Sequence, residues 1–219
     1  MQLQLLQLWL NTRQRSASRL LPILGTWWAR LLNVISGLLS GGAAAGGGTS
    51  YESISTTTVG AGGSSSITFS SIPSTYSHLQ IRGIGRSLEA NTGLDLIFMR
   101  FNSDTASNYS WHQLFGNGSS AASGAGTSVT IMRGGLITLN NEPANVFGGV
   151  VIDVLDYANA NKYKTIRSLS GADYNNTSGG VALNSGSWRN TNAITSITLN
   201  PSGGNWAQYS QFALYGIKG

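Results

Sequence analysis

Residues 147–169 read FGGVVIDVLDYANANKYKTIRSL, and this stretch indicates the class of fold. Short apolar-alternating runs cover residues 147–157 and 162–169, with the period of two that half-buried β-strands show. The four residues between the runs, 158–161, are Ala and Asn, and Asn is common in turns. The stretch therefore predicts two antiparallel strands joined in a hairpin.

Comparable runs recur through residues 49–219, separated by Gly, Asn, Ser and Pro. They predict further strands at 51–59, 66–69, 78–84, 94–101, 110–115, 128–132, 136–139, 181–183, 194–199 and 212–217, with a loop at 116–126. No helical period of useful length interrupts them, so no helix is available for parallel crossovers. About ten to twelve strands with frequent turns are typical of an all-β, antiparallel β-sandwich. In this sandwich Ile67 and Phe69 are expected to share one face of their strand, as are Ile197 and Leu199.

A different pattern precedes the β domain. On a helix with about 100° between neighbours, the polar and small residues of 22–40 gather in one arc and the apolar ones fill the rest. An amphipathic helix is therefore expected, ended by Gly41 and Gly42. The chain divides into an apolar, basic N-terminal tail (1–40), a Gly/Ala-rich linker (41–48) and a β-sandwich domain (49–219). The residues expected to serve in anchoring or oligomerisation are Leu21, Leu24, Trp27, Trp28, Leu31, Ile35 and Leu38.

Several roles for this tail stay open. Apolar residues spaced by three and four, from Leu21 to Leu38, favour a docking or oligomerisation helix. The alternatives are a secretory signal, a transmembrane span, a helix lying in a membrane interface and a helix packed on its own β domain. Arg30 interrupts the apolar run, which disfavours the signal and the span.

Charge is scarce and unevenly placed. Only 10% of the 219 residues are charged, and the formal net charge is +5. Four arginines and no acid occur in the first 48 residues, so the β domain is almost neutral. No clustered basic surface is visible there, so no nucleic-acid partner is expected. The absence of cysteine excludes disulfides and thiolate metal sites.

A family resemblance comes from five segments of the β domain: 51–54 (YESI), 66–73 (SITFSSIP), 78–82 (HLQIR), 153–157 (DVLDY) and 212–217 (FALYGI). Together they resemble a recurrent β domain of tailed-bacteriophage virion proteins, including those of cyanophages and marine phages. The resemblance covers roughly residues 51–219. It implies a jelly-roll domain that decorates heads or forms fibres and tail appendages, and it implies a homo-oligomer, for which a trimer is expected. The tail of residues 1–48 has no counterpart in it.

Catalytic residue patterns are scarce. His78 and His112 are the only histidines, and no nucleophile-elbow pattern accompanies them. Asp153 and Asp156 lie three apart on an expected strand and so point to opposite faces, which spoils a shared carboxylate site. Pairing of these acids with Lys162 or Lys164 across the hairpin is the expected alternative. No enzymatic activity, cofactor or metal is therefore predicted.

Four aromatic residues lie in or beside polar stretches: Trp111, Tyr174, Trp188 and Trp206. Such side chains can form platforms for sugars, and the alternative is that they pack within the sandwich or at a subunit interface. We therefore predict a non-enzymatic virion structural protein, displayed as capsid decoration (cement) or as a fibre. Its expected partners are major capsid or tail proteins. The alternative function is a receptor-binding tail adhesin that recognises host surface glycans.

Overall fold

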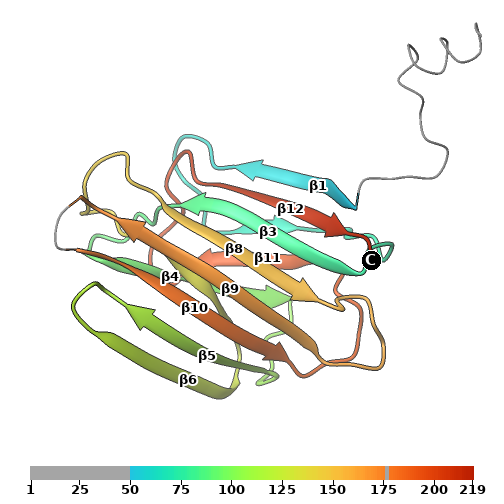
Figure 1. The fold of residues 1–219 in the computed structure, drawn as a ribbon. Helices are drawn as coiled ribbons and strands as arrows, with labels where there is room; N and C mark the ends of the chain where they lie inside the picture. The colour runs from blue at the N-terminus through green and yellow to red at the C-terminus, as the bar shows by residue number, and fades with distance from the viewer. Residues whose placement is uncertain (1–49, 176–177) are drawn as a thin grey trace, which may run out of the picture. The chain divides into compact units, whose positions relative to one another are not determined.

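The computed structural model describes residues 50–175 and 178–219, and these residues form an all-β domain (Figure 1). The N-terminal tail (1–40) and linker (41–48) lie outside the described residues, and so do the helix and the anchoring residues predicted there. The twelve strands are β1 (Tyr51–Thr58), β2 (Ile67–Phe69), β3 (His78–Gly85), β4 (Leu94–Phe101), β5 (Tyr109–Gly116), β6 (Ala121–Val129), β7 (Met132–Thr138), β8 (Gly148–Leu155), β9 (Lys164–Asp173), β10 (Gly179–Trp188), β11 (Ile197–Pro201) and β12 (Gln211–Ile217).

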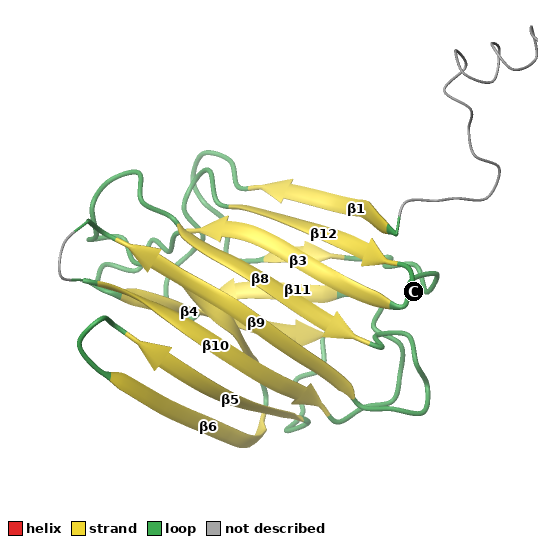
Figure 2. Cartoon of the chain, viewed as in Figure 1, coloured by secondary structure: helices red, strands yellow, loops and turns green. Residues whose placement is uncertain are grey.

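Two antiparallel sheets face each other (Figure 2). The larger has eight strands in the order β1-β12-β3-β8-β9-β10-β5-β6, and the smaller has four in the order β2-β11-β4-β7. The predicted hairpin is present as β8 and β9, with Val151 opposite Leu169. We call one half of the large sheet, β1-β12-β3-β8, the proximal half. The other half, β9-β10-β5-β6, is the distal half.

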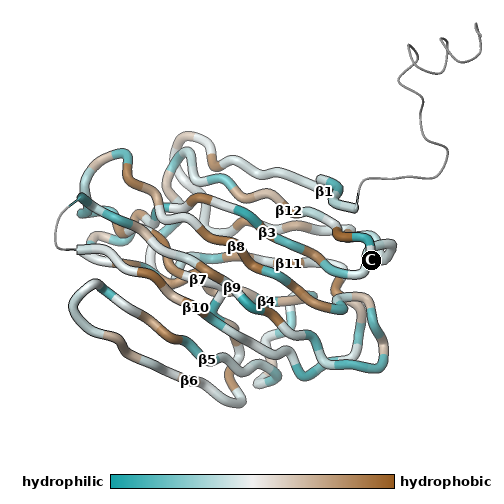
Figure 3. Tube along the Cα trace, viewed as in Figure 1, coloured by the Kyte–Doolittle hydropathy of each residue, from teal (hydrophilic) through white to brown (hydrophobic). Residues whose placement is uncertain are grey.

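The core lies between the sheets. Ile81 and Ile152 of the large sheet and Ile97 and Ile197 of the small sheet are completely buried in one cluster. Ile67, Phe69, Ile197 and Leu199 all point into it, as their alternation predicted. Burial alternates along β8, with Val150, Ile152 and Val154 inward, whereas the strand is apolar over most of its length (Figure 3). This burial on one face of each sheet is what holds the sandwich together.

One expectation about the strands is wrong. The loop predicted for 116–126 contains most of β6, which pairs with β5 from Ala121 to Gly126. The strand predicted for 128–132 instead straddles the connection between β6 and β7, where Ser128 has a positive φ of 53°. The sequence AASGAGTSV has weak strand propensity, and pairing with β5 overrides it.

Two buried cations hold loops in place. Arg86 donates to the carbonyl oxygens of Asn140, Glu142, Pro143 and Val146, at distances from 2.6 to 3.0 Å. Lys164 has no exposed surface, and its Nζ donates to the carbonyls of Asn159, Lys162 and Thr191. Each cation satisfies backbone oxygens that would otherwise be left without partners.

Candidate functional site

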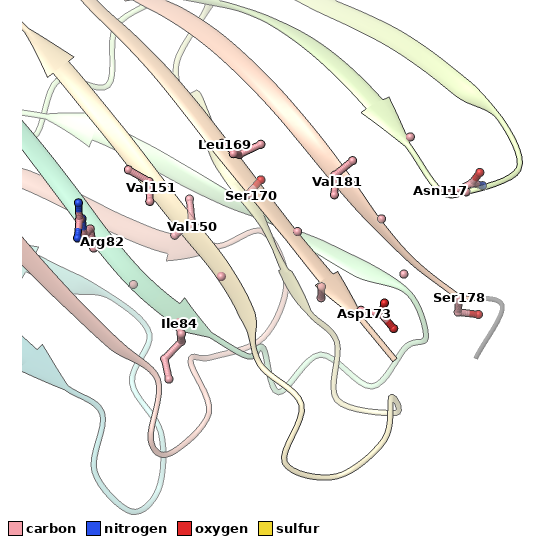
Figure 4. A pocket seen from close by; sticks show the side chains of 18 of the residues that line it. Arg82, Ile84, Asn117, Val150, Val151, Leu169, Ser170, Asp173, Ser178 and Val181 are labelled. Carbon is pink, nitrogen blue, oxygen red and sulfur yellow. The ribbon is translucent and has the colours of Figure 1, made fainter. Parts of the chain in front are cut away.

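A row of aliphatic side chains crosses the outer face of the large sheet. Val151, Leu169, Leu183 and Leu114 lie opposite one another on β8, β9, β10 and β5. They are between 37% and 57% exposed. Figure 4 shows Val151 and Leu169 on neighbouring strands of this face, with Val181 of β10 beside them. We call the four side chains that lie opposite one another, Val151, Leu169, Leu183 and Leu114, the aliphatic row.

Part of the distal half places polar side chains inside and aliphatic ones outside, although Ile166, Trp188 and Tyr109 of this half are buried in the core. Ser168, Ser170 and Asn184 are buried between the sheets, whereas Leu169 and Leu183 point to solvent. The proximal half has the usual arrangement, in which Leu79 and Ile81 are buried.

The reason for this reversal is a close approach of β7. A Cβ added at Gly135 would lie only 3.0 Å from the side chain of Ser170. The Ser170 hydroxyl also accepts the backbone N–H of Leu136 at 2.9 Å. The space between β9 and β7 at this point is narrow, and the smaller side chain of the pair 169–170 occupies it while Leu169 faces solvent.

Glycines hollow the same face beside the aliphatic row. Gly149 and Gly171 lie opposite each other between Ile84 and Val181. A groove of about 1310 Å³ follows these positions, and Arg82 and Asp173 are among the residues that line it (Figure 4). A second groove, of about 930 Å³, lies over the aliphatic row and reaches His112.

Next to the aliphatic row runs a polar row whose charges are internally paired. Asp153 lies opposite Gln80 on one side and Arg167 on the other. Its carboxylate accepts from Gln80 Nε2 at 2.7 Å and from Arg167 Nε at 2.9 Å. Arg82 Nε donates in turn to Gln80 Oε1 at 2.8 Å. Asp153 and Arg167 therefore balance each other, while Arg82, opposite Val151 at the end of the aliphatic row, adds one positive charge to this face.

Three of the four aromatic residues proposed for surface recognition are buried, so their expected exposure is wrong. Trp188 and Trp206 are 1% and 0% exposed, and Tyr174 is 4% exposed. Trp188 Nε1 donates to Asp104 at 2.7 Å, and Trp206 Nε1 donates to the Leu199 carbonyl at 3.1 Å. The Tyr174 hydroxyl donates to the Gly93 carbonyl at 2.7 Å. These rings anchor loops within the sandwich, because each polar atom finds a partner there while the ring packs in the core.

Trp111 is the exception, since it is partly exposed and packs against Arg133, a cation that lines a cleft. The guanidinium of Arg133 lies over its ring, 3.5 Å from the centroid. Arg133 also donates from Nη1 to Gln113 Oε1 at 2.8 Å. Sequence reasoning missed Arg133 because it lies on β7, twenty-two residues after Trp111, and only the sheet arrangement brings the two together.

The remaining titratable residues have structural contacts. His78 Nδ1 accepts the backbone N–H of Asp156 at 3.0 Å. The expected pairing across the hairpin is confirmed for Asp156, which accepts from Lys162 Nζ at 2.7 Å. That hydrogen bond lowers the pKa of Asp156 below its ordinary value. Asp153 pairs with Arg167 and with neither expected lysine.

Within residues 50–175 and 178–219, no three His, Cys, Asp or Glu side chains are grouped closely enough to share a metal ion. The same two stretches contain no helix of the length and apolarity needed to cross a membrane. Comparison with known proteins gives no matching family model, and no curated protein matches the sequence. Function is therefore inferred from the residues and their geometry.

Proposed function

We propose that this protein is a non-enzymatic structural protein of a bacteriophage particle, whose β domain is displayed as capsid decoration or fibre. The observation that carries the proposal is the aliphatic row, which leaves Leu169, Leu183 and Leu114 more than half exposed while polar side chains occupy the interior beneath them. Contiguous apolar patches on a protein surface mark interaction sites. A protein that functions in an assembly buries such a face against a neighbour.

We infer that this neighbour is a second copy of the chain. An eight-stranded sheet with strands about 4.8 Å apart and about eight residues long offers a face on the order of 1,000 Å². A standard protein–protein interface buries about 800 Å² on each partner. The paired charges of Asp153 and Arg167 allow two such faces to approach without strong repulsion.

The strand order supports a jelly roll with two inserted hairpins. Without β5, β6, β9 and β10, the sheets reduce to β1-β12-β3-β8 and β2-β11-β4-β7. The consecutive strands then alternate between the sheets, except that β4 and β7 are neighbours in the small sheet, as in the two Greek keys of a jelly roll. The inserted hairpins β5–β6 and β9–β10 are the distal half, so they supply three of the four members of the aliphatic row.

The test is the number of copies of this protein in purified phage particles, measured by quantitative mass spectrometry against the major capsid protein. A ratio that matches the capsid lattice assigns a decoration protein. A low ratio, comparable with tail components, assigns a fibre. Absence of the protein from the particle overturns the proposal.

The adhesin alternative is favoured by a separate observation. Of the aromatic residues proposed for recognition, Trp111 remains partly exposed and packs against Arg133, a cation that lines a cleft. Ligand binding in this cleft is compatible with a structural role.

A further inference from the structure

A cleft of about 510 Å³ lies along β7, where the β5–β6 hairpin extends past the small sheet. The residues that line it come from β4, β5, β6 and β7 and the adjoining loops. They include Leu94 and Leu96 of β4, Gln113 and Phe115 of β5, Ala122 and Gly124 of β6, and Arg133 and Leu136 of β7. The volume falls within the range of about 300–1,000 Å³ of small-molecule sites. We call it the Arg133 cleft.

The cleft has an unbalanced positive charge. Arg133 is its charged residue, and no Asp or Glu is among the described residues that line it. Three of the described acids form ion pairs elsewhere: Asp153 with Arg167, Asp156 with Lys162, and Glu52 with Lys218. Glu142 accepts the backbone N–H of Gly93 at the border of the cleft, and no ion pair joins it to Arg133. Burial lowers the pKa of Arg133 below its ordinary value, because the protein supplies no anion to offset the loss of water around the guanidinium.

The guanidinium is held in a fixed orientation. It stacks on Trp111, and one of its five N–H groups is committed to Gln113. The Trp111 ring is itself locked from the β6 side, since a Cβ at Gly126 would lie 2.5 Å from its Nε1. An arginine held in this way presents its remaining donors in a geometry that suits a carboxylate with two parallel hydrogen bonds.

The other walls indicate what carries that carboxylate. Leu94 and Leu96 are partly exposed and offer aliphatic surface, and the Gln113 amide adds hydrogen-bonding capacity beside the guanidinium. A sugar ring combines C–H faces, which suit the leucines, with hydroxyls, which suit an amide. A folded partner needs a far larger surface than this cleft provides.

We propose that the Arg133 cleft binds a carboxylate-bearing sugar residue, such as a uronic acid of an acidic glycan. Arg133 holds the carboxylate, and the leucines contact the ring. The inference deepens the adhesin alternative. It does not depend on incorporation into a particle, because binding is measured on the purified protein and incorporation by copy number.

The test is isothermal titration calorimetry on the full-length protein with uronic-acid trimers (galacturonate, glucuronate and mannuronate). The matched ligand control is the methyl ester of each trimer, which keeps the sugar and removes the charge. We expect saturable binding of at least one trimer and at least tenfold weaker binding of its ester. Arg133→Gln is expected to weaken binding at least tenfold, whereas Arg82→Gln, on the outer face, leaves it within twofold.

Gly124→Val provides a second variant that leaves the charge in place. A Cβ at Gly124 meets Trp111 at an ordinary contact distance of 3.4 Å, so the strand tolerates it while the larger side chain narrows the cleft. Loss of binding in this variant supports the site even where Arg133→Gln fails to fold. The proposal is overturned by equal binding of acid and ester, by unchanged binding in both variants, by binding of an acidic tripeptide alone, or by no binding of any trimer at millimolar concentration.

Discussion

The two halves of the large sheet differ in which face of the sheet is apolar. In the proximal half, Leu79, Ile81 and Phe212 are buried against the small sheet, and polar residues such as Gln80 face outward. In the distal half, Ser168 and Ser170 are buried and Leu169 is exposed. The proximal half stabilises the fold through its interior, whereas the distal half leaves apolar surface available to a partner. Both halves contribute to the core, since Tyr109, Ile166 and Trp188 of the distal half are also buried, but the distal half in addition exposes the three leucines of the aliphatic row.

The largest effect is expected from the core beside the proximal half. Trp206→Ala removes a fully buried ring that packs edge-on against Phe212 with centroids 4.8 Å apart. It should lower the free energy of unfolding by about 3–5 kcal/mol, measured by chemical denaturation. Leu169→Ala is the matched control and should change it by less than about 1 kcal/mol, because the side chain is 57% exposed. Similar losses for the two variants would remove the distinction between the halves.

A second variant tests why the distal half is reversed. Ser170→Leu introduces a large side chain where β7 comes close and removes the acceptor of the Leu136 N–H. Overpacking should lower the free energy of unfolding by about 1–3 kcal/mol, measured by the same denaturation. The exposed neighbour Leu169→Ser serves as the control with little expected loss. A stable Ser170→Leu protein would show that the sheets have room for a leucine at this position.

A third pair of variants tests the outer face. Leu169→Asp combined with Leu183→Asp places two charges in the aliphatic row, and a desolvated like-charge cluster opposes self-association. The dissociation constant of the oligomer should rise at least tenfold, as measured by analytical ultracentrifugation. Thr68→Asp places a charge at an exposed position of β2 in the small sheet, outside this face, and is the matched control. If the double variant associates as the unmodified chain does, the proposed subunit contact is wrong.

The smallest effect concerns acid stability. Hydrogen bonds from Asn108 and then from Trp188 lower the pKa of Asp104 below its ordinary value. The folded state therefore gains stability above the ordinary carboxyl pKa of about 3.9, and this gain is lost as the pH falls through the lower folded value. Asp104→Asn should reduce the dependence of stability on pH below about pH 4, measured by thermal unfolding between pH 2 and 5. An unchanged slope would assign the acid sensitivity to other carboxyls.

Much of the fold could be predicted from the sequence. Alternating residues indicated the β8–β9 hairpin and the shared faces of the pairs Ile67/Phe69 and Ile197/Leu199, because the period of two is a local property of a strand. The strand β6 could not be predicted, since Ala, Ser and Gly carry no alternating pattern. Its pairing partner β5 supplies the backbone hydrogen bonds that make it a strand.

The candidate sites were less accessible to sequence reasoning. The sequence shows that residues 188 and 206 are tryptophans. It does not show that both are buried, because their burial depends on loops that fold over the sandwich. Arg133 gave no signal by itself, because its significance comes from Trp111 and Gln113 on another strand.

The sequence predicts an alternating strand over residues 162–169, which ends at Leu169. The tertiary structure extends this strand through Ser170 to Asp173 as β9 and places Leu169 outward and Ser170 inward. Periodicity is the same for both orientations of a strand, so a local pattern cannot choose between them. Ser170 lies where β7 comes close, since a Cβ at Gly135 would be 3.0 Å from its side chain, and a serine occupies less of this narrow space than a leucine would.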